Sequence, residues 1–496
     1  MIPSREYTRV TSIKICSLRY EYLLQDVRNL YKSCMDTERI ELRSVTELRD
    51  LLDRLGGWPV VEGEDWRHED FTWHHLSIRA SREGMDTGRI MNIGIGTNPA
   101  DSERRMIKFD QFSPGLSREY LIKGFDDDDV QAYYNYMINM AVLLGADRER
   151  ARVELKESLM LELKLVEFAL PREKRRNKTA LHNPMALSEV QKLYPEFPME
   201  SYINTMIDYE PSNVDSSEIV NVAVPTFISQ VRDLLATVPA RVQANYMMWR
   251  NVKSQVSYLN DAALDIGLQY VKALVGKNSL EPRWEKCVKS AAGLGSPYLF
   301  FTEGSLTNAV GAMYAKKYFD LHDKQVADEM VENIRATFRI LLEEVDWMDD
   351  KTKAKALEKA DKITPHVAYA KEILNDDLVN EFYDDLELQG DSYLQNVLKL
   401  KKHINLYYAK QFRKPIIKND WRTHGGAAVV NAFYDSSENS IQFPAAVLGG
   451  VFFGAERPQY MNYGCIGYTV GHEITHGFDD GGSQKDGDGE AGGAGG

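Results

Sequence analysis

The chain has 496 residues, 43% of them hydrophobic and 27% charged, which is the composition of an ordinary soluble globular protein with two or more domains. No run approaches the roughly 18 consecutive apolar residues of a membrane-spanning helix, so no membrane segment is expected. A formal net charge of −14 argues against a nucleic acid as partner, because the phosphates would be repelled. The first residues lack the apolar core of a secretory signal, so the chain is either cytosolic or lacks its targeting segment.

Charged runs mark the boundaries of the first predicted elements. The acidic run Asp126 to Asp129 is read as a helix start or a solvated loop rather than a calcium site, because it lacks spaced oxygen ligands. The basic run at residues 172–178 is read as a solvated loop, since no aromatic residues interleave with it.

Helical periodicity dominates the chain. Apolar residues recur at helical spacing over residues 155–170, and Pro171 ends that segment. A second amphipathic stretch covers residues 326–345. The cluster Tyr246 to Trp249 is interpreted as core packing rather than as a cofactor site. These patterns predict a mainly α fold.

Strand signals are sparse until residue 427. Two β-prone runs, residues 427–434 and 440–444, flank a polar turn at residues 435–439, and Pro444 closes the second run. This pattern predicts a β-hairpin. It lies about 30 residues before the motif described next, so we expect one of its strands to line the same cleft.

The most informative motif is His-Glu-Ile-Thr-His at residues 472–476. Residues i and i+4 share one face of a helix, so the imidazoles of His472 and His476 can bind one tetrahedral zinc ion. Glu473 is placed to take a proton from a metal-bound water. Asp479 lies one turn further and could accept the second N–H of an imidazole. The motif therefore predicts a zinc hydrolase.

The cysteines and the carboxyl-terminal residues give two further predictions. Four cysteines are few for a secreted protein and favour a reducing compartment. Residues 483–496 are rich in glycine and are predicted to form a flexible, disordered tail.

Several motifs, taken in order along the chain, resemble the neprilysin family of zinc metalloendopeptidases, which includes the endothelin-converting enzymes. They are Leu30-Tyr31-Lys32-Ser33-Cys34-Met35, Gly57-Trp58-Pro59, Arg283-Trp284-Glu285-Lys286-Cys287, Asn308-Ala309-Val310-Gly311, Val430-Asn431-Ala432-Phe433-Tyr434, Phe443-Pro444-Ala445 and residues 462–480. The resemblance implies a large helical domain followed by the start of a thermolysin-like zincin catalytic domain with a short β-hairpin. The expected segments are residues 1–17, which are unmatched, 18–420, the helical domain, 421–482, the first part of the catalytic domain, and 483–496, the tail.

The same resemblance assigns roles to residues of the site. It implies that His472 and His476 bind one zinc ion per chain, that Glu473 is the catalytic base, and that Asp479 orients a ligand. The family strand holds the substrate backbone through an Asn-Ala pair, which corresponds to Asn431 and Ala432.

Substrate preference and cysteine pairing also follow from the resemblance. Val447 and Phe452, with Tyr468 and Thr469, match a pocket that receives a hydrophobic residue just after the cleaved bond, although ordinary core packing is nearly as good an account of them. Cys34 and Cys287 match two family cysteines that form a disulfide, which implies an oxidising compartment, at the cell surface or outside the cell. Cys16 and Cys465 match none and are expected to be free thiols, with Cys465 buried.

One departure from the family pattern leaves two functions open. Family members carry a third zinc ligand, a glutamate, well downstream of the helix, and that position is not found here, so two protein ligands are expected. The leading hypothesis is a zinc endopeptidase that cleaves peptides on the amino side of hydrophobic residues. The alternative is a truncated, catalytically incomplete homologue that binds peptides or a partner protein. The family is often membrane-anchored, but this chain shows no anchor.

Overall fold

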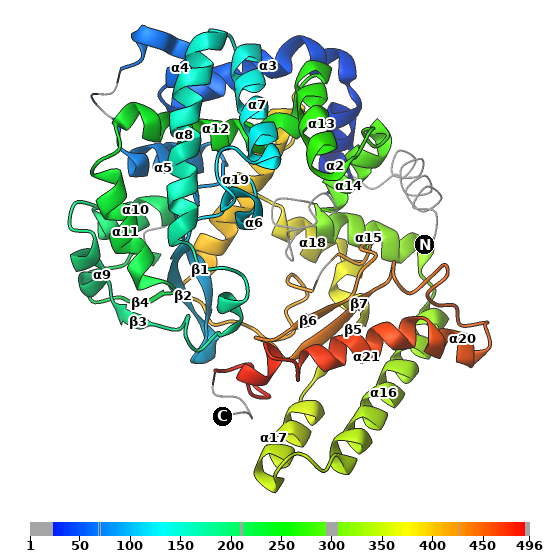
Figure 1. Cartoon of the computed structure of the whole chain (residues 1–496). Helices are drawn as coiled ribbons and strands as arrows, with labels where there is room; N and C mark the ends of the chain where they lie inside the picture. The colour runs from blue at the N-terminus through cyan, green and yellow to red at the C-terminus, as the bar shows by residue number, and fades with distance from the viewer. Residues whose placement is uncertain are drawn as a thin grey trace.

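A computed structural model describes residues 23–67, 69, 71–208, 212–293, 306–424 and 426–491. The fold is mainly α, as predicted, with two small sheets (Figure 1). The helices of the first part are α2 (Leu23–Met35), α3 (Thr37–Leu55), α4 (Pro59–Glu62), α5 (Trp73–Arg82), α6 (Arg118–Leu121), α7 (Asp128–Leu143), α8 (Arg148–Phe168), α9 (Leu187–Leu193), α10 (Met199–Ile207), α11 (Pro225–Leu235), α12 (Ala240–Gln255), α13 (Asp261–Val275) and α14 (Arg283–Ala292). The later helices are α15 (Thr307–Tyr318), α16 (Leu321–Glu344), α17 (Asp350–Asp361), α18 (Asp376–Phe382), α19 (Tyr393–Gln411), α20 (Gln459–Gly464) and α21 (Ile466–His476).

The strands form two separate sheets. The first has the order β1-β2-β4-β3 and the second the order β5-β7-β6. Their bounds are β1 (Met91–Asn98), β2 (Asp101–Gln111), β3 (Pro184–Ala186), β4 (Ile219–Val222), β5 (Thr364–Ala368), β6 (Phe433–Asp435) and β7 (Ser440–Pro444). Short 3-10 turns are η1 (Gly63–Asp65), η2 (Lys174–Arg176), η4 (Val256–Tyr258), η5 (Lys371–Leu374) and η6 (Gly482–Gln484).

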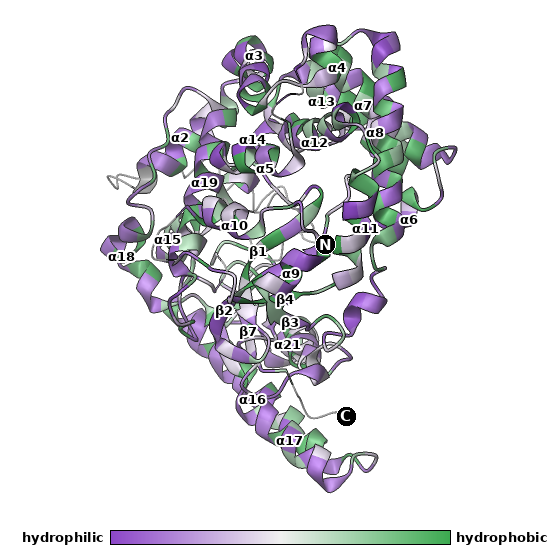
Figure 2. Cartoon of the chain, turned by 90° about the vertical axis from the view of Figure 1, so that its left-hand side faces the viewer, coloured by the Kyte–Doolittle hydropathy of each residue, from purple (hydrophilic) through white to green (hydrophobic). Residues whose placement is uncertain are grey.

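The two long predicted helices are confirmed as α8 and α16. Helix α8 begins where the side chain of Asp147 accepts a hydrogen bond from the N–H of Arg150, and it ends at Phe168, ahead of Pro171. The predicted acidic helix start is also present, because Asp127 caps α7. Figure 2 shows hydrophilic and hydrophobic residues alternating around the helices, and α16 and α17 project together from the body of the molecule.

The structure has two large hydrophobic cores. The first is built from residues 48–274 and from residues of α19, and it encloses the cluster Tyr246 to Trp249, which is fully buried as predicted. The second is built from residues 27–40 and 287–474. This second core includes residues from both sides of residue 420, so no separate core marks the predicted domain boundary there. That boundary stays a prediction.

The predicted disulfide is present. Cys34 on α2 and Cys287 on α14 are bonded, with their Cα atoms 5.6 Å apart, although 253 residues separate them in sequence. Both cysteines are buried in the second core, so the bond connects the beginning of the chain to that core. Cys16 lies outside the described residues. Cys465 is a free thiol but is exposed, so the prediction that it is buried was wrong: it lies between α20 and α21, beyond the face that α21 buries.

The predicted hairpin exists, but its first strand is shorter than expected. Strands β6 and β7 pair antiparallel, with Tyr434 opposite Ile441. Residues 427–432 form turns and irregular backbone instead of strand. The N–H of Val429 donates to the carbonyl of Gly426, and the carbonyl of Ala427 accepts from the N–H of Ala446 beyond β7. The β-prone residues are therefore used for a turn that tertiary contacts favour.

Residues 483–491 are held by hydrogen bonds, which differs from the flexible tail expected there. The ammonium of Lys359 donates to the carbonyls of Gly482 (2.7 Å) and Lys485 (2.8 Å), and the N–H of Ala491 donates to the carbonyl of Pro99 (2.7 Å). A Cβ on Gly482 would lie 2.0 Å from the carbonyl oxygen of His476. Glycine here permits close backbone packing rather than disorder. Residues 492–496 lie outside the described residues.

Across the parts of the chain that the structure covers, no helix combines the length and the apolar content needed to cross a bilayer.

Candidate metal centre

Helix α21 presents the two histidines of the motif side by side. The ring centroids of His472 and His476 are 4.5 Å apart and the rings are nearly perpendicular, at 82°. The opposite side of α21 is apolar and buried, through residues such as Val470 and Ile474, and packs against α16 and β6. Figure 1 shows α21 lying along the sheet β5-β7-β6. The helix is thus anchored on one side while its imidazoles remain accessible on the other.

Glu473 lies next to the histidines but is far less accessible than they are. Its residue is 6% exposed, whereas the side chain of His476 is 44% exposed. Burial raises the pKa of Glu473, and the charges of His476 and His472 oppose that rise only in part. A carboxylate with a raised pKa binds a proton more readily than an exposed one, which suits a general base.

Asp479 lies within hydrogen-bond distance of the ring of His476. Its Oδ2 lies 2.9 Å from Nδ1 of His476, and its Oδ1 accepts the N–H groups of Gly481 (2.8 Å) and Gly482 (2.7 Å). Burial would raise the pKa of Asp479, but these hydrogen bonds lower it, so the carboxylate is ionised and can only accept. The proton of the neutral imidazole therefore sits on Nδ1, which leaves the Nε2 lone pair free to bind a metal.

The donor set at α21 fits zinc in kind, since two imidazoles and an outer carboxylate are typical of zinc sites. The described residues of α21 supply two of the three protein ligands that a catalytic zinc site normally has. Within the described residues, no third His, Cys, Asp or Glu side chain comes within ligand distance of both His472 and His476.

The residues expected to hold the substrate backbone lie immediately before β6. Asn431 is exposed and Ala432 is buried. Strand β6 packs against α21, and a Cβ on Gly477 would lie 3.3 Å from the hydroxyl of Tyr434. The structure therefore brings the segment that carries Asn431 and Ala432 next to the helix that carries the histidines.

The residues expected to form the apolar pocket belong to the second core. Val447 is 4% exposed, and Phe452 is partly buried against the same cluster. The carbonyl of Phe452 accepts the N–H of Ile466 at the start of α21. Tyr468 is 76% exposed, and its ring stacks on that of His472 at 6.5 Å. Val447 and Phe452 are thus packed as core residues beside α21.

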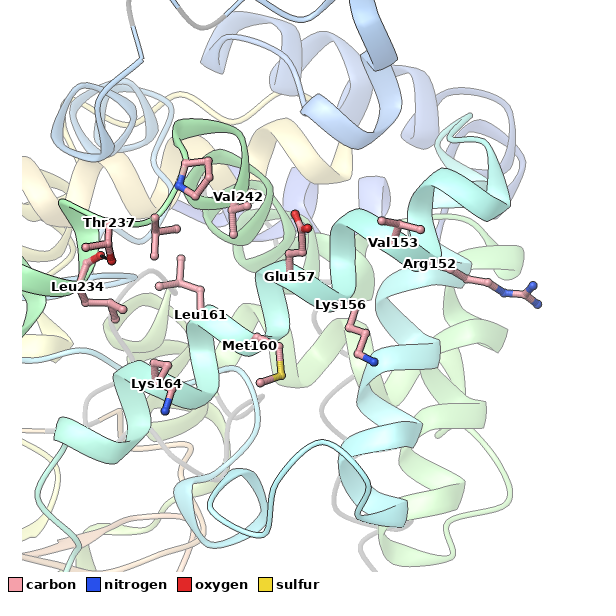
Figure 3. A pocket seen from close by; sticks show the side chains of 12 residues that line it. Arg152, Val153, Lys156, Glu157, Met160, Leu161, Lys164, Leu234, Thr237 and Val242 are labelled. Atoms are coloured by element: carbon pink, nitrogen blue, oxygen red, sulfur yellow. Dashed lines mark hydrogen bonds between the residues drawn. The ribbon is translucent and has the colours of Figure 1, made fainter.

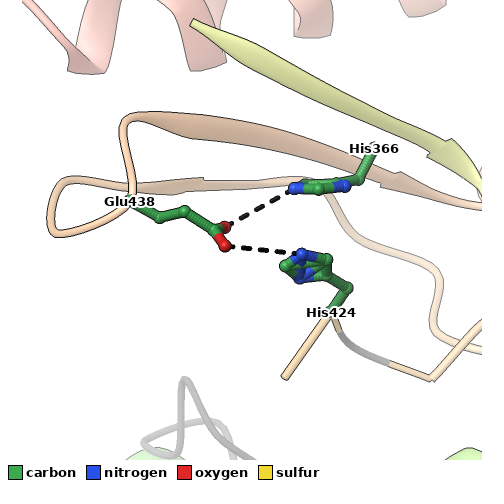
Figure 4. Close-up of side chains that lie close together, drawn as sticks. All are labelled: His366, His424 and Glu438. Atoms are coloured by element: carbon green, nitrogen blue, oxygen red, sulfur yellow. Dashed lines mark ion pairs between the residues drawn. The ribbon is translucent and has the colours of Figure 1, made fainter. Parts of the chain in front are cut away.

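Sequence reasoning missed a second group of potential ligands. His366, His424 and Glu438 come together although they span 72 positions, and their ligand atoms all lie within 4.8 Å of one another (Figure 4). They belong to β5, to the loop before β6 and to the turn between β6 and β7. No local spacing in the sequence could have revealed them, because only the pairing of β5 with β7 brings them together.

A groove of about 610 Å³ lies elsewhere, on the outer side of α8 (Figure 3). It is mainly apolar and is lined by α8 and by the connection from α11 to α12. Its residues are Arg152, Val153, Lys156, Glu157, Met160, Leu161, Lys164, Leu234, Thr237, Val238, Pro239 and Val242. It contains none of the residues predicted for the site.

Comparison with known families accounts for the motif and the fold together. The amino-terminal model of peptidase family M13 matches residues 7–370, and a second model of the same family matches residues 431–493. The chain belongs to peptidase family M13. The match extends beyond residues 18 and 482, the limits expected from the motifs.

Relatives of this M13 chain include neprilysin-2 from Drosophila melanogaster, 41% identical over 458 residues, which are 92% of the chain and 59% of that protein. Membrane metallo-endopeptidase-like 1 from Mus musculus is 32% identical over 477 residues, which are 93% of the chain and 60% of that protein. The chain thus spans about three fifths of the length of these curated relatives.

Solved structures share the fold. The zinc metalloprotease Zmp1 of Mycobacterium tuberculosis, in complex with an inhibitor, aligns with a TM-score of 0.81 at 24% identity, over 98% of this chain and 70% of that one. PepO from Lactobacillus rhamnosis aligns with a TM-score of 0.79 at 19% identity, over 98% of this chain and 73% of that one.

Proposed function

We propose that the chain acts as a zinc-dependent metalloendopeptidase that hydrolyses peptides on the amino side of hydrophobic residues, with one zinc ion at α21. The observation that carries the proposal is the geometry of that helix, where Asp479 leaves Nε2 of His476 free and Glu473 is buried beside both imidazoles. Membership of family M13 supports the same activity.

The residues of α21 would divide the chemistry between them. His472 and His476 would hold the zinc ion, and Asp479 would keep His476 in the tautomer that binds. Zinc bound there would supply Lewis-acid polarisation of the scissile carbonyl and of the attacking water. Glu473, whose pKa is raised by burial, would take the proton from that water and pass it to the leaving amine.

The substrate would bind as an added strand. Strand β6 is an edge of the sheet β5-β7-β6, so an extended peptide can pair beside the segment that leads into it. The exposed amide of Asn431 could both donate to and accept from one peptide unit, and Ala432 could contribute its backbone. Val447 and Phe452 would form the wall that receives the hydrophobic residue after the cleaved bond.

The test is cleavage of a fluorogenic peptide with a hydrophobic residue after the scissile bond, by the parent chain and by Glu473→Gln. Loss of a general base predicts a rate lower by about 10²- to 10⁴-fold. Glu149→Gln, which alters an exposed glutamate on α8 (76% exposed), is the matched control and should keep the parental rate. Equal rates for the parent and Glu473→Gln would overturn the proposed role of Glu473.

A second candidate function rests on the two-ligand donor set at α21. The alternative is a catalytically incomplete homologue that holds peptides or a partner protein without cleaving them. It predicts that peptide binding, measured by fluorescence polarisation, occurs without turnover and without zinc at His472. Peptide hydrolysis that is abolished by a chelator and restored by zinc would exclude this alternative.

The location of the protein is proposed from its relatives and its disulfide. A bond between Cys34 and Cys287 would persist in an oxidising compartment, so we place the protein at the cell surface or outside the cell. The natural partners would be peptide substrates rather than nucleic acids, in keeping with the net charge of −14.

A further inference from the structure

Two histidines and a glutamate converge on the second sheet, separately from α21. His366 is on β5, paired in register with Gln442 of β7, and Glu438 is in the turn that joins β6 to β7. His424 approaches from the loop before β6. Figure 4 shows both imidazoles directed at the two oxygens of the carboxylate.

The two imidazole–carboxylate distances are longer than good hydrogen bonds. Nε2 of His366 is 3.5 Å from Oε2 of Glu438, and Nε2 of His424 is 3.5 Å from Oε1. Good N–H···O hydrogen bonds are about 2.9 Å long. Two ligands at 2.0–2.1 Å from a tetrahedral zinc are about 3.3 Å apart, close to the separation seen here.

The three side chains are largely buried, and one ring nitrogen of each histidine has no hydrogen-bond partner. The side chains of His366, His424 and Glu438 are 20%, 4% and 13% exposed. Nε2 of His366 and Nε2 of His424 are both buried without a hydrogen-bond partner. A buried polar group without a partner destabilises a folded protein, so two of them facing one carboxylate call for a shared ligand.

The carboxylate is also held in place from behind. The hydroxyl of Ser440 donates to Oε2 of Glu438 (2.6 Å), and the N–H of Asn419 donates to Oε1 (2.5 Å). These bonds orient Glu438 while leaving lone pairs on both oxygens. The sheet β5-β7-β6 thus positions His366 and the turn that carries Glu438, and His424 reaches them from the loop before β6.

We propose that His366, His424 and Glu438 form a binding site for a divalent transition-metal cation of the zinc type, distinct from the site on α21. Two imidazoles and a carboxylate, with a fourth position for water, are a known zinc donor set. His424 and Glu438 bracket Asn431 and Ala432 in sequence, so the ion would fix that segment to β5. This proposal does not depend on the proposed peptidase activity.

The experiment uses the full chain with His472→Ala and His476→Ala, which removes the α21 ligands. Zn²⁺ is titrated by calorimetry, and Co²⁺ is titrated by visible absorption, which reports tetrahedral coordination. We expect about one equivalent of either ion to bind, and the addition of Glu438→Gln or His424→Ala to weaken binding by at least about 100-fold. Zn²⁺ should raise the thermal midpoint of the background protein but not that of its Glu438→Gln derivative.

The matched control is His403→Ala in the same background. Nε2 of His403 is likewise buried without a hydrogen-bond partner, but His403 is outside the cluster, so its removal should leave metal binding unchanged. If His424→Ala does not fold, as judged by circular dichroism, the nearly isosteric Glu438→Gln decides the question. The proposal is overturned if the background protein binds no metal, or if Glu438→Gln binds it as tightly as the background does.

Discussion

The ion pair between Glu162 on α8 and Arg250 on α12 offers the sharpest test of the energetics of the first core. The two side chains are 0% and 5% exposed, and their charged atoms are 3.3 Å apart. The hydroxyl of Tyr133 donates to Oε2 of Glu162 (3.1 Å), and the N–H of Gly115 donates to Oε1 (2.5 Å). The charge of Glu162 is thus buried and compensated chiefly by one guanidinium.

Substitution of Arg250 by Met should be strongly destabilising. It leaves the Glu162 carboxylate buried without its counter-charge, which typically costs about 3–5 kcal/mol of unfolding free energy. The double variant Glu162→Gln with Arg250→Met removes both charges and retains an amide oxygen as acceptor. It should therefore be more stable than Arg250→Met alone, although it carries one more substitution.

Urea unfolding followed by tryptophan fluorescence measures this difference. Nε1 of Trp249 donates to the hydroxyl of Tyr133 (2.7 Å), so its emission reports on this part of the core. Arg152→Met, which breaks an exposed pair with Glu149, is the control and should change stability by less than about 1 kcal/mol. The single variant Glu162→Gln is measured as well. The reasoning is refuted if Arg250→Met costs no more than the control, or if the double variant loses as much stability as Arg250→Met and Glu162→Gln lose together.

Three further predictions concern other parts of the chain. Replacing Cys34 and Cys287 by Ser opens a link across 253 residues and should cost up to about 5 kcal/mol, seen as a lower urea midpoint; an unchanged midpoint would contradict this. Gly84→Ala places a Cβ 2.2 Å from a backbone carbonyl of α19 at a φ of +76°, so we expect a loss of about 3 kcal/mol, whereas Gly94→Ala, with open space, should be nearly neutral. Desolvation and a neighbouring histidine lower the pKa of His74 from 6.5 to about 4. Between these two pH values the unfolded state therefore binds more protons than the folded state does. Stability should therefore fall as the pH falls from 6.5 towards 4, and His74→Gln should flatten this slope; an unchanged slope would count against a neutral buried His74.

Features that depend on residues close together in the chain could be predicted from its sequence. The helix α8, its end before Pro171 and the burial of Tyr246 to Trp249 follow from spacing and residue type alone. The disulfide between Cys34 and Cys287 was reached only through resemblance, because spacing cannot identify cysteine partners.

Errors arose where neighbours distant in sequence outweigh local preference. The β-prone residues 427–432 form a turn because the backbone of Ala427 pairs with Ala446 beyond β7. The glycine-rich residues 483–491 are held because Lys359 and Pro99 supply partners for their backbone. Composition reports local propensity, whereas these segments are stabilised by contacts that composition does not contain.

The two groups of potential metal ligands show the same contrast between what local sequence determines and what contacts between distant segments determine. His472, Glu473 and His476 lie within five consecutive residues, so the pitch of one helix determines their relative placement, and the sequence by itself determined that candidate centre. His366, His424 and Glu438 lie on three separate segments, and their approach to within 4.8 Å depends on the parallel pairing of β5 with β7. Only the tertiary structure decided this second cluster, because strand pairing across many residues leaves no fixed spacing in the chain.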